Sequence, residues 1–214
     1  MKRALVHSET DIAHELGYVG EWLDANEYSV ERLYRDNTGS PISFPPADLL
    51  INLGSLNSAA DGYTQTPALA EIAAIKEWIN TGNTYIGICY GAHLLANAVG
   101  GRVERQPSTL RTVESVNTPE ILGPWVRWHE DFIIDVGSAR VHSQDDDVVL
   151  LFQSGSAWGV QPHLELTPET LTRMATSAGT PPEHYLPLVE SLSSNQVEAR
   201  DSAFALFDRM VGHS

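Results

Sequence analysis

The chain has 214 residues, 42% of them hydrophobic, which is enough for one sizeable α/β domain and short for two. A formal net charge of -15 argues against nucleic acid or an anionic membrane as a partner, because binding phosphate groups requires a basic surface. The single cysteine excludes an internal disulfide and a CxxC metal site, and it suits a reducing compartment. With no long apolar run and no charged-then-apolar leader, we expect a soluble cytoplasmic protein.

Apolar β-like runs alternate with helical patterns in the first half of the chain, which is typical of a mainly parallel sheet with helices on both faces. The expected strands cover residues 4–7, 29–34, 48–53 and 85–88, and the expected helices cover residues 15–26 and 67–81. A loop is expected at residues 37–46, which are rich in Gly, Ser and Pro.

Shorter β-like stretches follow Gly100 and Gly101, and we expect them to form an antiparallel extension that leads toward residue 163. They cover residues 111–116, 132–136, 139–142 and 148–152. From residue 166 onward the pattern becomes helical, with Thr167 as an N-cap and Pro168 in the first turn. The expected organisation is a single domain over residues 1–214 with a helical C-terminal tail from about residue 166.

Residues 87–93 have the sequence GICYGAH, in which the only cysteine lies between two glycines. An apolar strand precedes Cys89 and a helical run follows it, which is typical of a nucleophile elbow. Small neighbours allow the sharp turn that projects the central side chain from the sheet. At a helix N-terminus, the helix dipole and the unpaired N–H groups favour the thiolate. The alternative is a buried, inert cysteine, and this motif alone leaves both readings open.

A second segment, residues 158–165 with the sequence WGVQPHLE, supplies the partners that a cysteine nucleophile needs. A base must take the thiol proton, and an acceptor must fix the orientation of that base. Residues two apart on a strand point to the same side, so Glu165 can orient His163 while the other ring nitrogen faces the thiol. The alternative, an ordinary polar strand end, loses weight in a chain that also carries an elbow cysteine.

These segments resemble the class I glutamine amidotransferases of the Cys-His-Glu triad type, in particular the stand-alone GMP-synthase-like amidotransferases. The family pattern G-x-C-x-G-x-Q is met at Gly87, Cys89 and Gly91, and the pattern G-V-Q-x-H-x-E is met within residues 159–165. Two further segments match in the family's order, residues 53–58 (LGSLNS) for the Gly-Gly-Pro-x-Ser oxyanion loop and residues 128–132 (WHEDF) for the His-Gly-Asp segment.

The resemblance implies a flavodoxin-like α/β fold with an open, mainly parallel sheet, helices on both faces and a small antiparallel extension. It implies Cys89, His163 and Glu165 as the catalytic triad, and the backbone N–H groups of Ser55 and Tyr90 as the oxyanion hole. The residues that it implies for substrate binding are Gly54, His93, His129 and Asp131.

The implied reaction is hydrolysis of the γ-glutamyl amide bond of glutamine or of a γ-glutamyl-amine, through a thioester on Cys89, to give glutamate plus ammonia or an amine. This chemistry needs no metal and no organic cofactor. Two alternatives stay open. One is a glutaminase subunit that delivers ammonia to a separate synthetase or ligase, and the other is a non-catalytic relative that acts as a binding module. The intact triad makes the binding module the least favoured.

Two departures from the family pattern concern the substrate. His93 stands where glutamine is usual, one helical turn after Cys89, and either packing or substrate contact explains it. Ser55 replaces the second glycine of the oxyanion loop, although its backbone N–H can still donate. Trp125, Trp128 and Trp158 are expected to be core or rim packing. The alternative is that one of them lines the leaving-group side, which would suit a bulky or aromatic amine.

Overall fold

The computed structural model describes residues 2–12, 14–35, 42–62, 64, 66–106, 112–118 and 121–212. The strands are β1 (Lys2–Ser8), β2 (Tyr28–Tyr34), β3 (Leu49–Asn52), β4 (Thr84–Ile88), β5 (Arg102–Arg105), β6 (Thr112–Val116), β7 (Trp125–His129), β8 (Asp131–Asp135), β9 (Arg140–Asp145), β10 (Val148–Ser154) and β11 (Ala157–Val160). The helices are α1 (Gly17–Ala25), α2 (Thr66–Asn80), α3 (Tyr90–Ala98), α4 (Pro168–Ser177), α5 (Pro182–Ser194) and α6 (Gln196–Val211).

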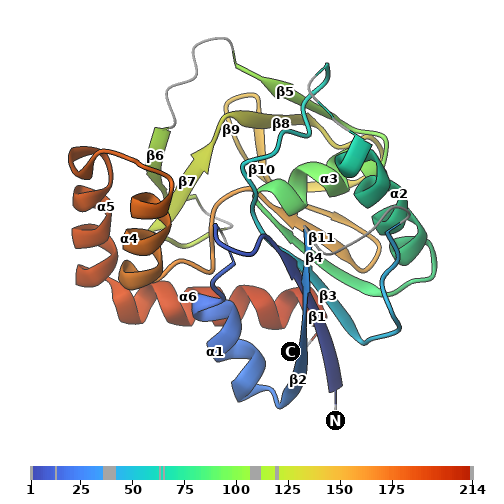
Figure 1. The fold of residues 1–214 in the computed structure, drawn as a ribbon, viewed down its shortest axis with the longest axis horizontal. Coiled ribbons are helices and arrows are strands. Elements are labelled where there is room, and N and C mark those ends of the chain that lie inside the picture. The colour runs from blue at the N-terminus through green and yellow to red at the C-terminus, as the bar shows by residue number, and fades with distance from the viewer. Residues whose placement is uncertain are drawn as a thin grey trace.

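The main sheet has the strand order β2-β1-β3-β4-β11-β10-β9. The strands from β2 to β11 in this order run parallel, and β10 and β9 add an antiparallel edge. This order places β11 directly beside β4, so the two segments that follow these strands meet at one edge of the sheet. The expected open, mainly parallel α/β sheet with a small antiparallel extension is confirmed (Figure 1).

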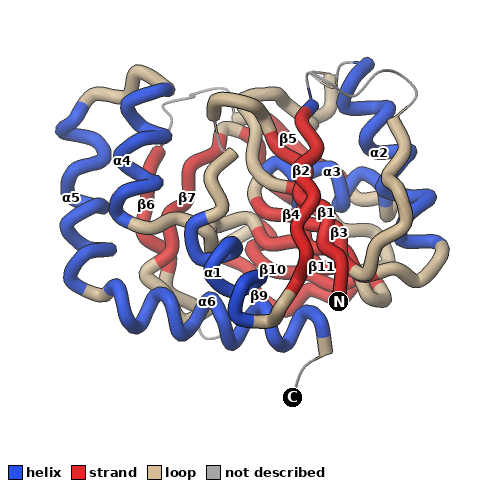
Figure 2. Tube along the Cα trace, turned by 60° about the horizontal axis from the view of Figure 1, so that its bottom comes forward, coloured by secondary structure: helices blue, strands red, loops and turns tan. Residues whose placement is uncertain are grey.

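Helices cover both faces of this sheet, as expected (Figures 1 and 2). Ala4 and Val6 of β1 pack with α1 and α6 on one face, whereas Leu5 packs with α2 and α3 on the other. Successive side chains of a strand point to opposite faces, so the middle of β1 (residues 4–6, ALV) and β3 (residues 49–51, LLI) must be apolar at consecutive positions to serve two cores. This explains why these strands appear in the sequence as continuous apolar runs.

The antiparallel region differs from the sequence expectation. Of the stretches expected to form one extension, only β9 and β10 join the main sheet, whereas β6 pairs with β7 and β8 pairs with β5 in separate two-stranded sheets. Neither β5 nor β7 was expected. β5 has the sequence RVER, in which a single apolar residue is too short a signal to mark a strand. β7 has the sequence WVRWH and is buried throughout, so its polar residues do not alternate with apolar ones as in a half-exposed strand.

The helices after residue 166 pack beside β6 and β7 and beneath the main sheet (Figure 1). α4 begins as expected, because the Thr167 side chain accepts a hydrogen bond from the backbone N–H of Thr170 and completes a capping box with it. The expected loop at 37–46 lies partly outside the described residues, which resume at residue 42 and form a loop up to β3.

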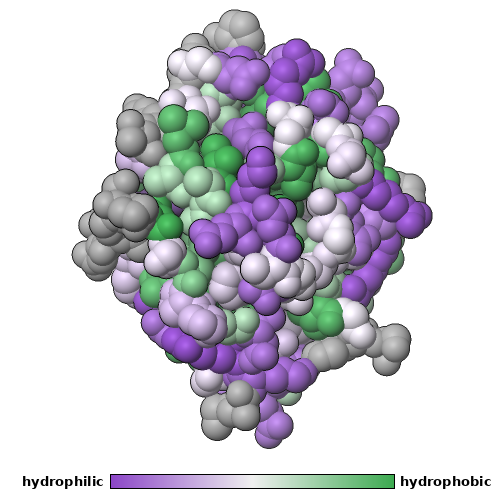
Figure 3. Space-filling view, turned by 90° about the vertical axis from the view of Figure 1, so that its right-hand side faces the viewer, coloured by the Kyte–Doolittle hydropathy of each residue, from purple (hydrophilic) through white to green (hydrophobic). Residues whose placement is uncertain are grey.

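The molecular surface on the α2 side is mainly hydrophilic, and hydrophobic atoms lie there in small groups (Figure 3). α2 exposes Leu69, whereas its Ala68, Ile75 and Trp78 are buried against the sheet. Among the described residues, no helix has the length and hydrophobicity needed to span a membrane.

Candidate active site

Cys89 occupies the turn between β4 and α3 and has a strained backbone. Its φ of 54° and ψ of -111° lie in a region that residues with a side chain rarely adopt, at a cost of about 1–3 kcal/mol. The turn is held on both sides, because Cys89 N–H donates to the Val160 carbonyl at 2.9 Å and the Cys89 carbonyl accepts from Ala92 and His93. The expected elbow geometry is present, with Cys89 at the N-cap of α3.

Both glycines of the elbow are required by close packing of backbones. A Cβ added to Gly87 would lie 2.4 Å from the carbonyl oxygen of Gly91, and one added to Gly91 would lie 2.1 Å from the carbonyl oxygen of Asn52. The first glycine lets α3 fold back onto β4, and the second lets α3 pass over the end of β3. The Gly-x-Cys-x-Gly spacing therefore follows from the packing of the helix on two strands.

His163 follows β11, the strand that pairs with β4, and this places its ring beside Cys89. The expectation that His163 and Glu165 lie on a strand is wrong, because β11 ends at Val160 and Pro162 has no N–H for a further ladder bond. A single bridge to Val126, with His163 N–H donating to its carbonyl at 2.8 Å, holds the segment instead. The predicted pair still forms, since His163 Nδ1 lies 2.6 Å from Glu165 Oε1.

The electrostatic environment of His163 favours its protonated form. Burial lowers the pKa of the imidazole, but the Glu165 carboxylate and the charge and hydrogen bond of Cys89 outweigh burial and raise the pKa well above its usual value. An imidazolium between a carboxylate and a sulfur anion is the arrangement that stabilises a thiolate nucleophile. Cys89 Sγ also lies 3.8 Å from the Trp128 carbonyl oxygen.

A cavity of about 100 Å³ opens onto Cys89 and His163. The residues that line it are Ile12, Ser55, Leu56, Asn57, Ser58, Cys89, His93, Arg105, Trp128, His129, Glu130, Asp131, His163, Met174 and Ala178. The sequence-predicted residues Ser55, His93, His129 and Asp131 are thus brought together at the nucleophile. Gly54, Tyr90 and Glu165 lie outside this lining, and Glu165 borders a second cavity of about 400 Å³ behind the triad.

One group of lining side chains, which we call the polar wall, consists of His93, His129 and Asp131. Asp131 Oδ2 accepts hydrogen bonds from the Ser58 hydroxyl at 2.7 Å and the Ala59 N–H at 2.9 Å, but Asp131 Oδ1 is buried without a partner among the described residues. A buried carboxylate oxygen that lines a cavity and has no donor suits a ligand that brings one.

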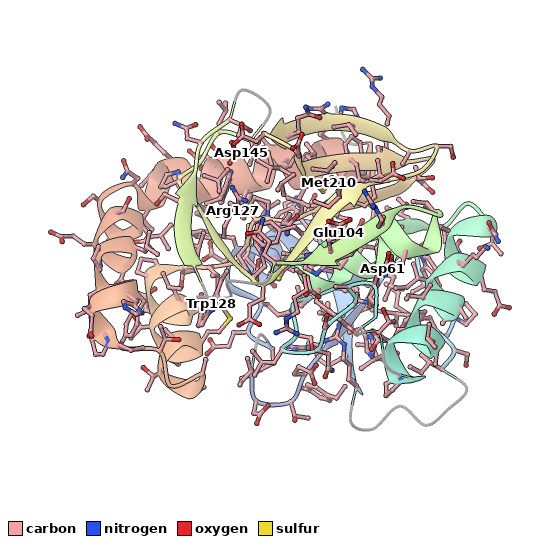
Figure 4. The ribbon with its side chains drawn as sticks, turned by 90° about the horizontal axis from the view of Figure 1, so that it is seen from above. Asp61, Glu104, Arg127, Trp128, Asp145 and Met210 are labelled. Carbon is pink, nitrogen blue, oxygen red and sulfur yellow. The ribbon has the colours of Figure 1, made fainter. Side chains whose placement is uncertain are left out.

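The two histidines of the polar wall are neutral. His129 Nε2 accepts from Arg127 Nε at 3.3 Å, which leaves the ring proton on Nδ1, and burial lowers the pKa of His129 well below its usual value. Arg127 in turn pairs with Asp145 at 2.6 Å, and Figure 4 shows both residues on the same side of the molecule. A backbone hydrogen bond with Asp131 raises the pKa of His129 but does not offset burial, and His129 Nδ1 is buried.

His93 combines the two roles that the sequence left open. It is buried and packed, with Nε2 at 3.2 Å from Gln161 Nε2, and it also lines the cavity. Burial lowers the pKa of His93 to about 4, so its Nε2 can accept the hydrogen bond from the Gln161 amide. The Gln161 side chain also donates to the Asp131 carbonyl and accepts from the Ile133 N–H. These hydrogen bonds connect the segment that precedes His163 to the polar wall.

A second group of lining side chains, which we call the apolar wall, consists of Ile12, Trp128, Met174 and Ala178. These belong to one hydrophobic cluster between β7 and the C-terminal helices, and Figure 4 shows Trp128 beside α4. Trp125 and Trp158 are core residues, as expected for most of the tryptophans. Sequence reasoning missed Ile12, Met174 and Ala178, because they carry no motif and come from segments far from the triad in the chain.

The predicted oxyanion loop and elbow lie next to each other. Ser55 lines the cavity, its hydroxyl donates to Glu9 and accepts from the Asn57 N–H at 3.0 Å, and the Gly54 carbonyl accepts from Arg35. Tyr90 is the first residue of α3, where a backbone N–H has no acceptor within the helix. Among the described residues, no cluster of three or more His, Cys, Asp or Glu side chains is arranged to hold a metal ion.

Solved structures with the same fold include glutamine amidotransferases. A glutamine amidotransferase from Thermotoga maritima superposes with a TM-score of 0.80 at 20% identity, over 98% of each chain. One from Methylobacillus flagellatus gives 0.78 at 18% identity, over 100% of this chain and 95% of the other. A putative GMP synthase subunit from Thermoplasma acidophilum gives 0.56 at 16% identity, over 98% and 93%.

No protein-family model matches the sequence, and no curated protein is significantly similar to it. The structural similarity therefore establishes the fold. The chain has the class I glutamine amidotransferase fold over its full length, and the resemblance inferred from four short motifs is confirmed at that level.

Proposed function

We propose that this protein is a thiol-dependent amidohydrolase of the class I glutamine amidotransferase type that cleaves a γ-glutamyl amide bond. The observation that carries the proposal is the placement of Cys89, at a strained helix N-cap, beside a His163–Glu165 pair and at the floor of a cavity. Backbone strain of this kind persists where the surrounding structure enforces it, and it is concentrated at functional sites.

In the proposed reaction, the Cys89 thiolate adds to the amide carbon, and the carbonyl π electrons move onto oxygen, where N–H groups of Ser55 and Tyr90 stabilise the oxyanion. The oxyanion collapses, the C–N bond breaks, and the imidazolium of His163 gives its proton to the leaving nitrogen. His163 then takes a proton from water, which cleaves the thioester to glutamate and restores the thiolate. Glu165 orients the ring throughout.

The polar wall supports recognition of the amino-acid end of a γ-glutamyl group. An α-ammonium group is the donor that the unpartnered Asp131 Oδ1 lacks. Arg105, which pairs with Glu130, adds a cation to the same cavity. We therefore propose that the α-amino-acid group lies against the polar wall while the side-chain amide reaches Cys89.

The apolar wall supports a leaving group larger than ammonia. Ile12, Trp128 and Met174 present hydrocarbon and aromatic surface to the cavity, and transferring an apolar amine substituent onto such surface gains about 25 cal/mol per Å². Glutamine has no substituent to place there. A γ-glutamyl amide of an apolar or aromatic amine would use this surface, and we propose this class as the preferred substrate.

The test is glutamate release by purified wild-type protein and Cys89→Ala, with no partner added. Glutamine, γ-glutamyl methylamide, γ-glutamyl benzylamide and the glutaryl benzylamide that lacks the α-amino group are compared. We expect release that depends on Cys89, with kcat/KM at least about 10-fold higher for the benzylamide than for glutamine, and little cleavage of the glutaryl compound. Equal kcat/KM values for glutamine and γ-glutamyl benzylamide would contradict the proposed role of the apolar wall.

A second candidate is a glutaminase subunit that delivers ammonia to a separate synthetase. It is favoured by the similarity to a putative GMP synthase subunit, which shares the fold over nearly the whole chain. This candidate predicts that glutamine is the best substrate and that the isolated protein is nearly inactive. Absence of release from every amide in the panel would favour this candidate or a non-catalytic binding module over a free-standing hydrolase.

A further inference from the structure

Arg35 directly follows β2 and contacts three consecutive residues, Asn52 to Gly54, where β3 ends and the predicted oxyanion loop begins. Its Nη2 donates to the Asn52 side-chain oxygen and to the Leu53 carbonyl at 3.0 Å, and its Nη1 donates to the Gly54 carbonyl at 3.1 Å. Arg35 is not among the residues that line the cavity containing Cys89.

The bond to Gly54 determines where the next N–H points. The Gly54 carbonyl and the Ser55 N–H belong to one planar peptide group, in which a trans bond directs them in opposite directions. When Arg35 holds the carbonyl, the Ser55 N–H must point away from Arg35, and Ser55 lines the cavity that contains Cys89. A hydrogen bond from a cation also polarises this peptide group and makes its N–H a stronger donor.

The same guanidinium also contacts the other half of the predicted oxyanion hole. Its central carbon lies 5.0 Å from the centre of the Tyr90 ring, within the range of a cation–π contact. Tyr90 is buried and follows Cys89 directly. One buried cation therefore contacts Tyr90 and the peptide group that carries the Ser55 N–H, the two places from which the oxyanion is expected to receive hydrogen bonds.

Arg35 is itself fixed by buried acidic side chains. Its Nε lies 3.1 Å and 3.3 Å from the two carboxylate oxygens of Glu71, and its Nη1 lies 3.6 Å from Glu9, which accepts the Ser55 hydroxyl bond. Burial raises the pKa of Glu71, but the charge of Arg35 and the bond to His7 outweigh it and lower the pKa below its usual value. The carboxylate thus stays ionised and leaves both Nη groups of Arg35 directed at the loop.

We propose that Arg35 is a positioning residue for the oxyanion hole, which orients the Gly54–Ser55 peptide and braces Tyr90. The proposal rests on the amide hydrolysis proposed above. It assigns to Arg35 an effect on the transition state and none on substrate binding, because the negative charge on the substrate oxygen develops only during attack.

The kinetic test compares wild type, Arg35→Lys and the double variant Arg35→Met/Glu71→Met, which removes the buried pair together and avoids leaving Glu71 unpaired. We expect kcat for a γ-glutamyl amide to fall by about 10- to 100-fold in the double variant with KM within about 3-fold, because one donor of the hole becomes misdirected. Arg35→Lys should lie between, since one ammonium cannot reach both carbonyls and Glu71.

The control is Arg32→Met, also on β2 and partly buried, whose guanidinium bonds the Ser8 hydroxyl and the His14 carbonyl and makes no contact with the loop. Its kcat should stay within about 2-fold of wild type. A double variant with unchanged kcat, or with a fall in kcat that Arg32→Met reproduces, would overturn the proposal.

A crystal structure of the double variant provides a readout that does not depend on turnover. We expect the Gly54–Ser55 peptide to rotate so that the Ser55 N–H leaves the cavity. If the peptide keeps its orientation without Arg35, the proposal is wrong even if the wild type is an active hydrolase. If the wild type cleaves no amide, the proposed function fails, and the peptide orientation still decides whether Arg35 positions the loop.

Discussion

The elbow around Cys89 and the walls of the cavity above it are built in different ways. The elbow is made from seven consecutive residues, 87–93, and its shape depends on two glycines that let backbones touch. The walls are made by side chains from distant segments, such as Ile12, Asp131 and Met174. If the proposed function holds, the reaction chemistry is encoded in one short segment of the sequence, whereas substrate selection depends on tertiary packing.

Replacing the residue that orients the base should have the largest effect on the local half of the site. In Glu165→Gln the charge that raises the pKa of His163 is lost, while burial, which lowers this pKa, remains. A smaller fraction of the protein molecules then contains the imidazolium–thiolate pair, and kcat should fall on the order of 10²- to 10⁴-fold. Iodoacetamide labelling of Cys89 at pH 6 should slow in parallel, and unchanged labelling would show that Glu165 does not act through this pair.

Adding a side chain where two backbone segments of the elbow touch should lower the free energy of unfolding. In Gly91→Ala the new Cβ would lie 2.1 Å from the Asn52 carbonyl, so α3 must move off β3, and we expect a loss of at least about 3 kcal/mol. The matched control is Gly82→Ala, where φ is 81° and nothing lies within 4 Å, at a cost of about 1–2 kcal/mol. Urea unfolding measures both, and equal losses would contradict the close-packing explanation.

His93, one of the two buried histidines of the polar wall, should make the fold acid-sensitive. The pKa of His93 is lowered to about 4, so between pH 6.5 and 4 the unfolded chain binds a proton there that the folded chain does not. Stability from this group is therefore present above about pH 6.5 and decreases as the pH falls, by roughly 3 kcal/mol at pH 4.

His93→Gln should remove that part of the acid sensitivity and keep a hydrogen bond to Gln161. Urea unfolding at pH 7 and pH 4.5 provides the comparison, with the exposed His184→Gln as the control. If both variants lose stability equally between the two pH values, His93 does not contribute to the acid response.

The smallest expected effect concerns the apolar wall. Met174→Ala should raise KM for γ-glutamyl benzylamide by about 3- to 10-fold, because apolar contact is lost, and change KM for γ-glutamyl methylamide by less than 2-fold. Steady-state kinetics on the two amides measures this. A similar rise for both would mean that Met174 supports the fold of the site and does not select the amine.

The sequence predicts the parts of this molecule that depend on short-range rules. The central parallel strands have apolar cores because both their faces are covered, and the elbow is recognisable because small residues must flank Cys89. The His163–Glu165 contact was also predicted, although the reason given for it was wrong. Pro162 ends the strand, and the bridge to Val126 brings the two side chains together instead.

The remaining features depend on contacts between distant segments. Arg35 lies 17 to 19 residues along the chain from Asn52, Leu53 and Gly54, whose oxygen atoms it binds. Nothing in its local sequence distinguishes it from other arginines. β7 was missed because its Arg127 and His129 are buried and bonded to each other, which hides the pattern of an ordinary strand. Local periodicity cannot reveal a polar residue whose partner is supplied by the fold.

The most direct test of the central claim is detection of the thioester on Cys89. Wild-type protein is mixed with excess γ-glutamyl benzylamide, quenched in acid within the first turnovers, and analysed by intact-protein and peptide mass spectrometry. The account predicts one added γ-glutamyl group on the peptide that contains Cys89, released by hydroxylamine and absent from Cys89→Ala. Glutamate release that continues in Cys89→Ala, with no adduct on the wild-type thiol, would contradict it.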